Sequence, residues 1–460
     1  MRDLVLTLFI MGMLPLAYLR PVVGLMMWSW IGYMNPHRLT WSYAYDFRFN
    51  FIVAFVTLAG VIFNRDIKLR IPMTATTVVW ILFIIWMTVT TFMSFAPDKA
   101  MWEWQRVIKI QAMVVVTFIV VNDRKWLERL LWVIVISVGV WVIKGGIFTI
   151  LSGGKYRVYG PLYSFIQDNN ALALAVIMVI PMMVYLLMQL KKPWQRMLMW
   201  GGILLSLVTV VGSYSRGGLL GLGVISLLIM LRGKKRVFSL GAMLVAVLIL
   251  LLVMPQSWKN RMDDLTQLWS VEKLVQDDSM MGRLNSWVFA YRLASDRPFI
   301  GGGFRTFRGV LFEKYAPVPE VHDAHSIYFE VLAEQGFFGF GLFILMHLLA
   351  VRLTMRTIKL ARGHKNLVWA GQMAAMLQIS MIGYYVSGAF LGLAYFDLPY
   401  QIIAMIIILY TVVQRERAGV QSTTSSKDVI LRRTRNMKSI FGRVGEAAGK
   451  DEEKSTKWAT

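Results

Sequence analysis

The chain contains no cysteine, and only 16% of its residues are charged. The missing thiols exclude disulfide bonds and thiolate chemistry, and they are compatible with a large exposed face in an oxidising compartment. The low charge content accompanies 57% apolar residues, against about 45–50% in an ordinary soluble domain. A soluble fold could not bury so much apolar surface, so the composition predicts a membrane protein.

Apolar runs recur along the chain, and runs of roughly 17–25 residues are long enough to cross the bilayer core. We expect no cleavable signal peptide, because the first run lacks a basic n-region and a small-residue cleavage site. That run, 4–34, is interrupted at Leu19–Pro21, which indicates a broken helix or a tight hairpin. We predict an all-α polytopic protein with about 12 transmembrane helices, the others near 49–63, 73–94, 104–121, 130–150, 169–190, 197–213, 217–231, 238–254, 336–357, 367–390 and 399–413.

The net charge of +23 could suggest a nucleic-acid partner, but the distribution of basic residues indicates a membrane instead. Five loops carry three to five basic residues each: 64–70, 122–129, 191–196, 232–236 and 352–365. The alternating loops carry two or fewer: 35–48, 95–103, 151–168, 213–216 and 391–398. This positive-inside pattern places the second set outside. The basic, polar tail 414–460 is then predicted to be cytoplasmic, disordered and held against anionic lipid.

The only long loop between predicted spans is 255–335, which the charge pattern places on the outer face. A loop of this length is too long to lack structure in a compact protein. Its stretch "NSWVFAYRLASDRPFI" has helical periodicity, and "RPFIGGGF" is typical of a turn. We therefore expect a folded outer subdomain, with function where the loop meets the helix bundle.

Two arginines are candidates for binding an anion. Arg216 lies in "GSYSRGGLLGLG" between two apolar runs, where it either snorkels to the membrane surface or binds an anion. Ser213 and Ser215 can donate hydrogen bonds there, and the following helix directs free N–H groups outward. Arg283 in "MMGRLNSW" is the second candidate. Two further basic residues of the same loop compete with it, Arg305 and Arg308.

His322 and His325 form the motif "HDAH", whose spacing puts both imidazoles on one face of a helix. A zinc site is one interpretation, but no convincing third ligand is visible beyond Asp323. A second interpretation is a polar helix cap. The third is a general base, since a neutral imidazole near pH 7 can take a proton from a hydroxyl.

The short helix that we expect after these histidines contains two carboxylates, Glu330 and Glu334. A carboxylate near the membrane surface is costly unless it has a role or a partner. Gly336 is predicted to end this helix, as glycine often does at a helix C-terminus.

These motifs occur in an order that resembles the O-antigen ligase and O-antigen polymerase superfamily of bacterial inner membranes. The order is "SRGG" in a tiny loop, a long loop with an arginine, then "HSIYFEVLAEQG" entering a helix. The stretch "DNNALALAVIMVIPM" resembles the start of the shared domain, and "RPVVGLMMWSWIGYMNP" is similar to O-glycosylation ligases associated with exosortase systems. The resemblance covers most of 1–415 and predicts an N-terminal transmembrane region, 1–168, and a ligase-like domain, 169–413.

The resemblance implies transfer of a glycan from undecaprenyl diphosphate to an acceptor hydroxyl of lipid A core or protein, at the periplasmic face of the inner membrane. Arg216 and Arg283 would bind the diphosphate, because arginine matches phosphate oxygens bidentately, and His325 would activate the acceptor. Supporting roles fall to His322, Ser215, Glu330, Asp168 and Asn169. No "D-x-D" motif is present; we expect no metal and no cofactor, and direct displacement would invert the anomeric centre.

Two alternatives stay open. The first is polymerisation, in which the acceptor is another lipid-linked glycan. The second is a transporter or flippase, which usually places charges within spans near the bilayer midplane. The candidates Arg106, Lys109 and Lys144 each lie near a span end, which favours an enzyme.

Overall fold

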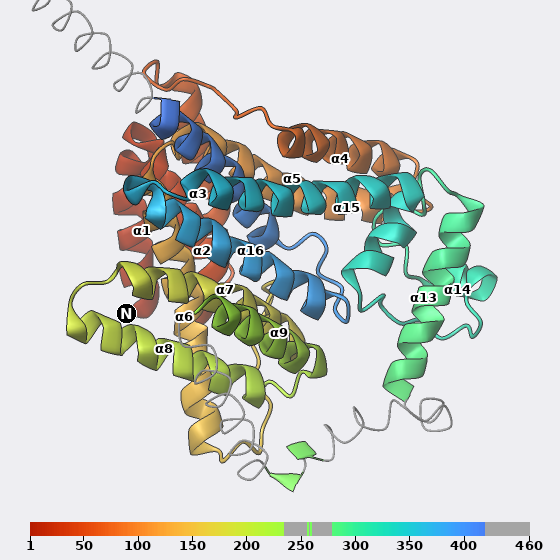
Figure 1. Ribbon diagram of the computed structural model, residues 1–460. Helices are drawn as coiled ribbons and strands as arrows, with labels where there is room; N and C mark the ends of the chain where they lie inside the picture. Colours follow the sequence, from red (N-terminus) through yellow and green to blue (C-terminus); the bar gives the residue numbers. More distant parts are fainter. Residues whose placement is uncertain (234–254, 257, 260–277, 419–460) are drawn as a thin grey trace, which may run out of the picture. The chain divides into compact units, whose positions relative to one another are not determined.

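The computed structural model describes residues 1–233, 255–256, 258–259 and 278–418. Within these ranges the secondary structure is helical, without a strand. The helices are α1 Arg2–Leu19, α2 Pro21–Met34, η1 Pro36–Leu39, α3 Phe49–Phe63, α4 Ala75–Phe92, α5 Pro97–Val120, α6 Arg124–Leu151, α7 Asn169–Gln189, α8 Pro193–Gly212, α9 Arg216–Arg232, α13 Asp278–Asp296, α14 Gly309–Tyr315, α15 Ile327–Ala361, η3 Lys365–Leu367, α16 Val368–Gly388 and a last helix Asp397–Ala418. Residues Met1–Tyr410 form one unit, and the description below concerns that unit (Figure 1).

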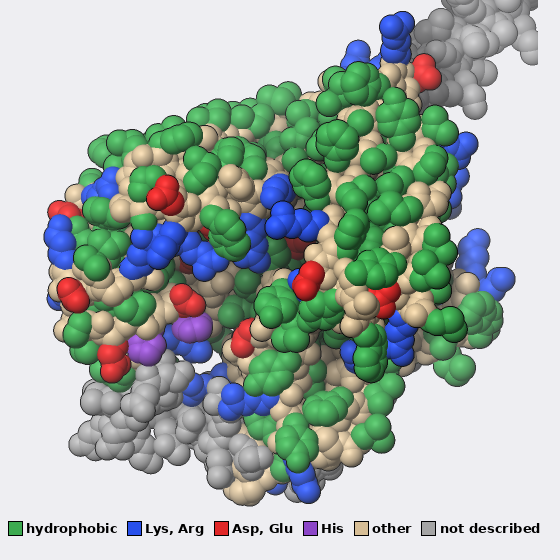
Figure 2. All heavy atoms as spheres, turned by 180° about the vertical axis from the view of Figure 1, so that it is seen from behind, with side chains coloured by type: hydrophobic (Ala, Val, Ile, Leu, Met, Phe, Trp, Pro, Cys, Tyr) green, Lys and Arg blue, Asp and Glu red, His purple; other side chains and the backbone are tan. Residues whose placement is uncertain are grey.

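Seven described helices are long and apolar enough to cross a membrane: α1, α4, α6, α7, α8, α15 and Asp397–Ala418. Apolar side chains cover large parts of the surface in Figure 2, as expected of a face that meets lipid. The predicted spans 217–231 and 367–390 form α9 and α16, which fall outside the seven. The predicted span 238–254 lies outside the described residues, so the total of about 12 stays a prediction.

The first apolar run forms two helices, as its internal "LRP" indicated. Arg20, between α1 and α2, has φ −131° and ψ 82° and leaves the helical region. Proline disfavours a helical conformation in the residue before it, and it is well suited to the first position of the next helix. Pro21 therefore ends one helix and begins the other.

The helix α7 is the most buried of the seven candidate spans. Its sequence is apolar on all sides, which is typical of a helix enclosed by others. It packs against α16, α8, α9 and α6. Gly383 of α16 permits a close approach, because an added Cβ would lie 2.8 Å from the Ile177 side chain. Small residues have this role between membrane helices generally.

The segment after the undescribed residues forms the folded subdomain that we predicted. "NSWVFAYRLASD" lies in α13, and α14 packs against it beside the beginning of α15 (Figure 1). The two helices share an apolar core with α15, made of Phe289, Ala290, Leu293, Phe312, Tyr315 and Ala333. This core fixes the positions of the loops that reach the site.

The long helix α15 is interrupted at Gly336, which confirms the predicted end of the short helix. Gly336 has φ 68° and ψ −177°, so two helices meet there. The predicted turn "RPFIGGGF" wraps around this break. The Gly302 N–H donates to the carbonyl of Ala333 at 2.8 Å, and the Phe337 N–H donates to the carbonyl of Pro298 at 2.7 Å. The turn therefore satisfies backbone groups on both sides of the interruption.

The helix α4 holds the same interruption from the other side. The Thr90 hydroxyl donates to the side-chain oxygen of Gln335 at 2.5 Å, and the Trp86 indole N–H donates to the Gln335 carbonyl at 3.1 Å. The Ser94 hydroxyl donates to the carbonyl of Gly302 at 3.1 Å. The N-terminal part of the chain thus fixes the short helix and its glycine turn.

The end of the described chain differs from the sequence prediction in one detail. The predicted tail begins at 414, but the last helix continues to Ala418. The residues from 419 onward lie outside the described part of the chain.

Candidate functional site

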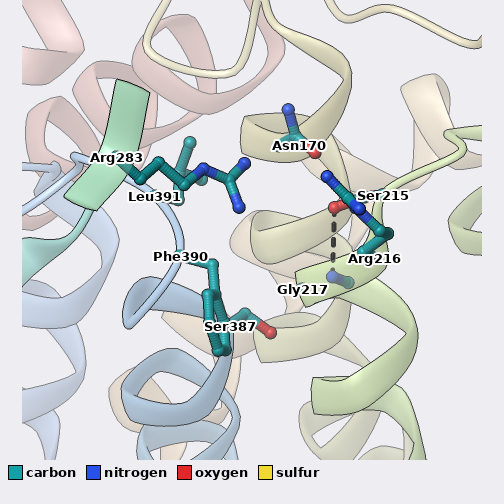
Figure 3. Close-up of a pocket in the computed structure, with 9 residues that line it drawn as sticks. Asn170, Ser215, Arg216, Gly217, Arg283, Ser387, Phe390 and Leu391 are labelled. Carbon is teal, nitrogen blue, oxygen red and sulfur yellow. Dashed lines mark hydrogen bonds between the residues drawn. The ribbon is translucent and has the colours of Figure 1, made fainter. Parts of the chain in front are cut away.

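The first part of the site is a narrow pocket at the beginning of α9, which we name the arginine pocket. Ser215 caps this helix by accepting a hydrogen bond from the Gly218 N–H at 3.0 Å. Arg216 and Arg283 reach toward the same space from α9 and α13 (Figure 3). The lining also includes Asn170, Gly217, Ser387, Phe390 and Leu391. The structure therefore brings together the two arginines that the sequence proposed, although 67 residues separate them.

The arginine pocket has the electrostatics of an anion site. Two guanidinium groups, the hydroxyl of Ser215 and the N-terminus of α9 all favour negative charge. The enclosed space is about 10 Å³, which is about the room that one water needs. A phosphate group requires more room, so its entry would turn the two arginine side chains, both of which are partly exposed.

The second part is a larger cavity, which we name the carboxylate cavity. It has a volume of about 600 Å³, within the range of roughly 300–1,000 Å³ typical of ligand pockets. It adjoins the arginine pocket, because Leu391 lines both. Its acidic and basic lining residues are Glu103, Asp168, Asp323, Glu330, Glu334, Arg106, Arg305 and His325, and Ser164 and Gln167 are also polar. Its aromatic lining consists of Tyr159, Phe165, Phe307, Tyr395 and Phe396.

His325 lies on the wall of the carboxylate cavity, directly before the cap of α15. Its backbone has φ 43°, which is uncommon outside glycine, although asparagine, aspartate and histidine adopt it more often than other residues. The preceding residues are fixed to α13, since the Ser286 hydroxyl donates to the carbonyl of His322 at 3.0 Å and the Trp287 indole donates to that of Ala324 at 2.9 Å. Strain at a site residue that neighbours hold in place is typical of functional positions.

The charges around His325 favour its neutral form. Burial lowers the pKa of His325, and the positive charge of Arg283 lowers this pKa further. Two acids, Asp323 and Asp168, act in the opposite direction. The net pKa is lower than the ordinary value of about 6.5. The imidazole is therefore unprotonated near pH 7 and can accept a proton.

The other predicted residues divide into two groups. Asp168 and Glu330 line the carboxylate cavity; Asp168 also caps α7, and Glu330 accepts a hydrogen bond from the Ala394 N–H at 2.9 Å. Asn169 has a structural position instead, buried and donating to the carbonyl of Ser213 at 2.7 Å. His322 lies outside the cavity lining, and its Nε2 is 3.5 Å from the carboxylate of Glu320.

Sequence reasoning missed the ion pair that joins the two halves of the chain. Glu103 on α5 lies 2.7 Å from the guanidinium of Arg305 and 3.4 Å from that of Arg106. The Arg106 guanidinium lies 3.7 Å from the ring centre of Phe165. A signal was available, because Glu103 and Arg106 are charged residues at the start of an apolar helix, where such residues often mark function.

The zinc interpretation of "HDAH" concerns the arrangement of the histidine and acidic side chains. Among the described residues, no group of three or more histidine or acidic side chains could hold a metal ion. His325 lines the carboxylate cavity, whereas His322 lies outside its lining.

These features define a multi-pass helical membrane protein with a polar, two-part cavity where several helices begin. Two family models match the chain. Residues 1–191 match a family of unknown function (DUF5935), and residues 201–344 match the O-Antigen ligase family. The second match covers 144 of the 460 residues and supports the resemblance to the O-antigen ligase superfamily that the motifs predicted. No curated protein matches the chain.

The match to the O-Antigen ligase family implies a membrane enzyme that transfers glycosyl groups, in ligation or polymerisation of glycans. The match begins 32 residues after the predicted start of the shared domain at 169. Residues 169–191 fall within the other family instead. The similarity to ligases associated with exosortase systems stays a prediction.

Proposed function

We propose that this protein moves a glycan from undecaprenyl diphosphate to an acceptor hydroxyl at the periplasmic face of the bacterial inner membrane. The observation that supports this proposal is the convergence of three side chains on adjoining cavities. Arg216 and Arg283 line one cavity, and His325 lines the other.

The reaction follows from the charges of these groups. His325 removes the proton from the acceptor hydroxyl, whose oxygen then forms a bond to the anomeric carbon of the glycan. The bond between that carbon and the diphosphate oxygen breaks, and the diphosphate leaves with the bonding electron pair. Arg216 and Arg283 stabilise its charge through hydrogen bonds that need no proton transfer. The displacement inverts the anomeric centre.

A transfer assay with the purified full-length protein in lipid nanodiscs tests this proposal. The donor is an undecaprenyl-diphosphate glycan, and the acceptors are a lipid A core glycolipid, a serine-containing peptide and a second lipid-linked glycan. We expect transfer to one acceptor class, release of undecaprenyl diphosphate and inversion at the anomeric carbon. Addition of a chelator should leave the rate unchanged.

Each outcome of this assay is informative. Transfer to the lipid-linked glycan alone would make the protein a polymerase. Loss of activity with the chelator, restored by zinc, would replace the proposed base with a metal site. Movement of the donor across the bilayer without any transfer would contradict the proposal and support a flippase.

A further inference from the structure

One wall of the carboxylate cavity comes from the region that matches the family of unknown function. Glu103 and Arg106 belong to α5, and the segment between α6 and α7 supplies Tyr159, Ser164, Phe165 and Gln167. All of them precede residue 191, where that match ends. The proposed reaction uses none of these side chains, so the wall requires another explanation.

The position of this wall suggests that it contacts the acceptor substrate. In a direct displacement, the entering hydroxyl and the leaving diphosphate lie on opposite sides of the anomeric carbon. If the diphosphate occupies the arginine pocket, the acceptor occupies the carboxylate cavity. His325 suits this arrangement, because it lines the carboxylate cavity with Asp168 and Asp323 and also feels the charge of Arg283, which lines the arginine pocket.

The chemistry of the cavity fits a sugar that carries hydroxyl or amino groups. Carboxylates are strong acceptors for O–H and N–H donors, and aromatic faces can pack against the C–H faces of a sugar ring. Glu334 is only 5% exposed, and its Oε2 receives no hydrogen bond from a described residue. A buried carboxyl oxygen without a hydrogen-bond partner is costly, so a ligand that hydrogen-bonds to it would be favoured there.

Glu103 affects how the cavity would bind a charged ligand. Its carboxylate is paired with both arginines of the cavity, Arg305 and Arg106. Among the described residues, the other four carboxylates of the lining form no ion pair: Asp168, Asp323, Glu330 and Glu334. The single carboxylate of Glu103 offsets one of the two positive charges that could hold an acidic sugar. Because four further acids line the same cavity, an added carboxylate would meet more acidic than basic groups.

We propose that the carboxylate cavity is the acceptor subsite, that it takes a neutral or amino-bearing sugar and excludes an acidic one, and that Glu103 contributes to this selectivity by holding Arg305 and Arg106 in ion pairs. The inference rests on the proposed transfer reaction, and it gives the N-terminal region a role in choosing the acceptor. A peptide acceptor is the alternative that the test below must exclude.

The experiment compares two acceptor oligosaccharides that end in glucose or in glucuronic acid and therefore differ only at C6. The full-length protein transfers glycan to each in nanodiscs, and the readout is the ratio of the two kcat/KM values. We expect the wild type to favour the neutral acceptor by about tenfold, since a like charge in a poorly solvated site is strongly disfavoured.

Two variants break the same ion pair with opposite expected effects. Glu103→Gln releases both arginines, so the preference for the neutral acceptor should fall several-fold toward equality. Arg305→Gln removes one positive charge, so the preference should rise. A role for the pair in stability alone would lower both kcat/KM values by the same factor and leave both ratios at the wild-type value. Asp46→Asn, which breaks the exposed ion pair with Arg38, is the control and should leave the ratio unchanged.

A donor-free binding measurement separates the failure of this inference from failure of the proposed reaction. Calorimetric titration of the same two oligosaccharides should show the same preference. Preferential binding of the neutral oligosaccharide without any transfer would support the acceptor subsite and contradict the proposed transfer reaction. Transfer without any charge preference, or equal use of a serine peptide, would sustain the reaction and overturn the subsite.

Discussion

The arginine pocket and the carboxylate cavity share Leu391, yet their polar residues have opposite charge and opposite origins. Arg216 and Arg283 both lie within residues 201–344. The carboxylate cavity instead combines α5, the segment before α7, the glycine turn and the first turns of α15. The two arginines of the pocket that would hold the leaving group come from one family region, whereas the cavity that would hold the acceptor is assembled from both family regions.

The largest expected effect on kcat comes from His325, which lines the carboxylate cavity. His325→Ala should lower kcat by about 10²–10⁴-fold, because a general base typically contributes that much. The donor should still bind, which a titration with the lipid-linked glycan would measure. His322→Ala should change kcat far less, since its side chain is outside the cavity lining. Full activity of His325→Ala with an inactive His322→Ala would reverse the two roles.

The pH dependence sharpens the same prediction. Because the pKa of His325 is lowered, the base stays unprotonated at pH 7, and kcat should fall only below about pH 6.5. Arg283→Ala removes a positive charge that lowers this pKa, so the acid limb should move to higher pH. Asp323→Asn should move it to lower pH. If kcat falls at the same pH in the wild type and in both variants, a group other than His325 limits the rate.

A smaller effect is expected in the arginine pocket. Arg216→Lys keeps the charge but loses the planar pair of donors, so kcat/KM for the donor should fall about 10–100-fold, the equivalent of one charge-assisted hydrogen bond. Arg308→Lys, a change at a residue outside both cavities, is the control. Equal mild losses in the two variants would indicate only a general positive field.

The smallest effect is expected in the carboxylate cavity. Glu334→Gln replaces an oxygen that lacks a donor with an amide of similar size. The KM for the acceptor should rise several-fold, as loss of one hydrogen bond predicts, while donor affinity stays constant. Glu313→Gln, an exposed change on α14, should alter neither constant. A change in donor affinity would mean that the two parts do not bind separate substrates.

Local sequence signals predicted most helices and one part of the site. "LRP" marked the break at Arg20, Gly336 marked the break in α15, and "SRGG" marked the beginning of α9. Each signal depends on residues close in the chain, where proline, glycine and helix caps act directly. The same locality explains why Ser215 and Arg216 were found together.

The carboxylate cavity could not be predicted in this way. Glu103 and Arg305 are 202 residues apart, and no local rule connects them. The sequence also could not predict which of Asn169 and Asn170 lines the site. Neighbouring side chains on a helix point about 100° apart, and only packing determines which one faces the pocket. The structure turns Asn169 toward Ser213 and leaves Asn170 in the arginine pocket.

The interruption at Gly336 has a consequence for protein engineering. Thr90, Trp86 and Ser94 of the N-terminal region hold the short helix and its glycine turn through hydrogen bonds to Gln335 and Gly302. A chimaera that joins residues 1–191 of this chain to the ligase region of a relative would therefore lose these hydrogen bonds unless both partners of each bond were exchanged together. A working chimaera would therefore have to exchange the residues on both sides of this contact together, rather than either family region alone.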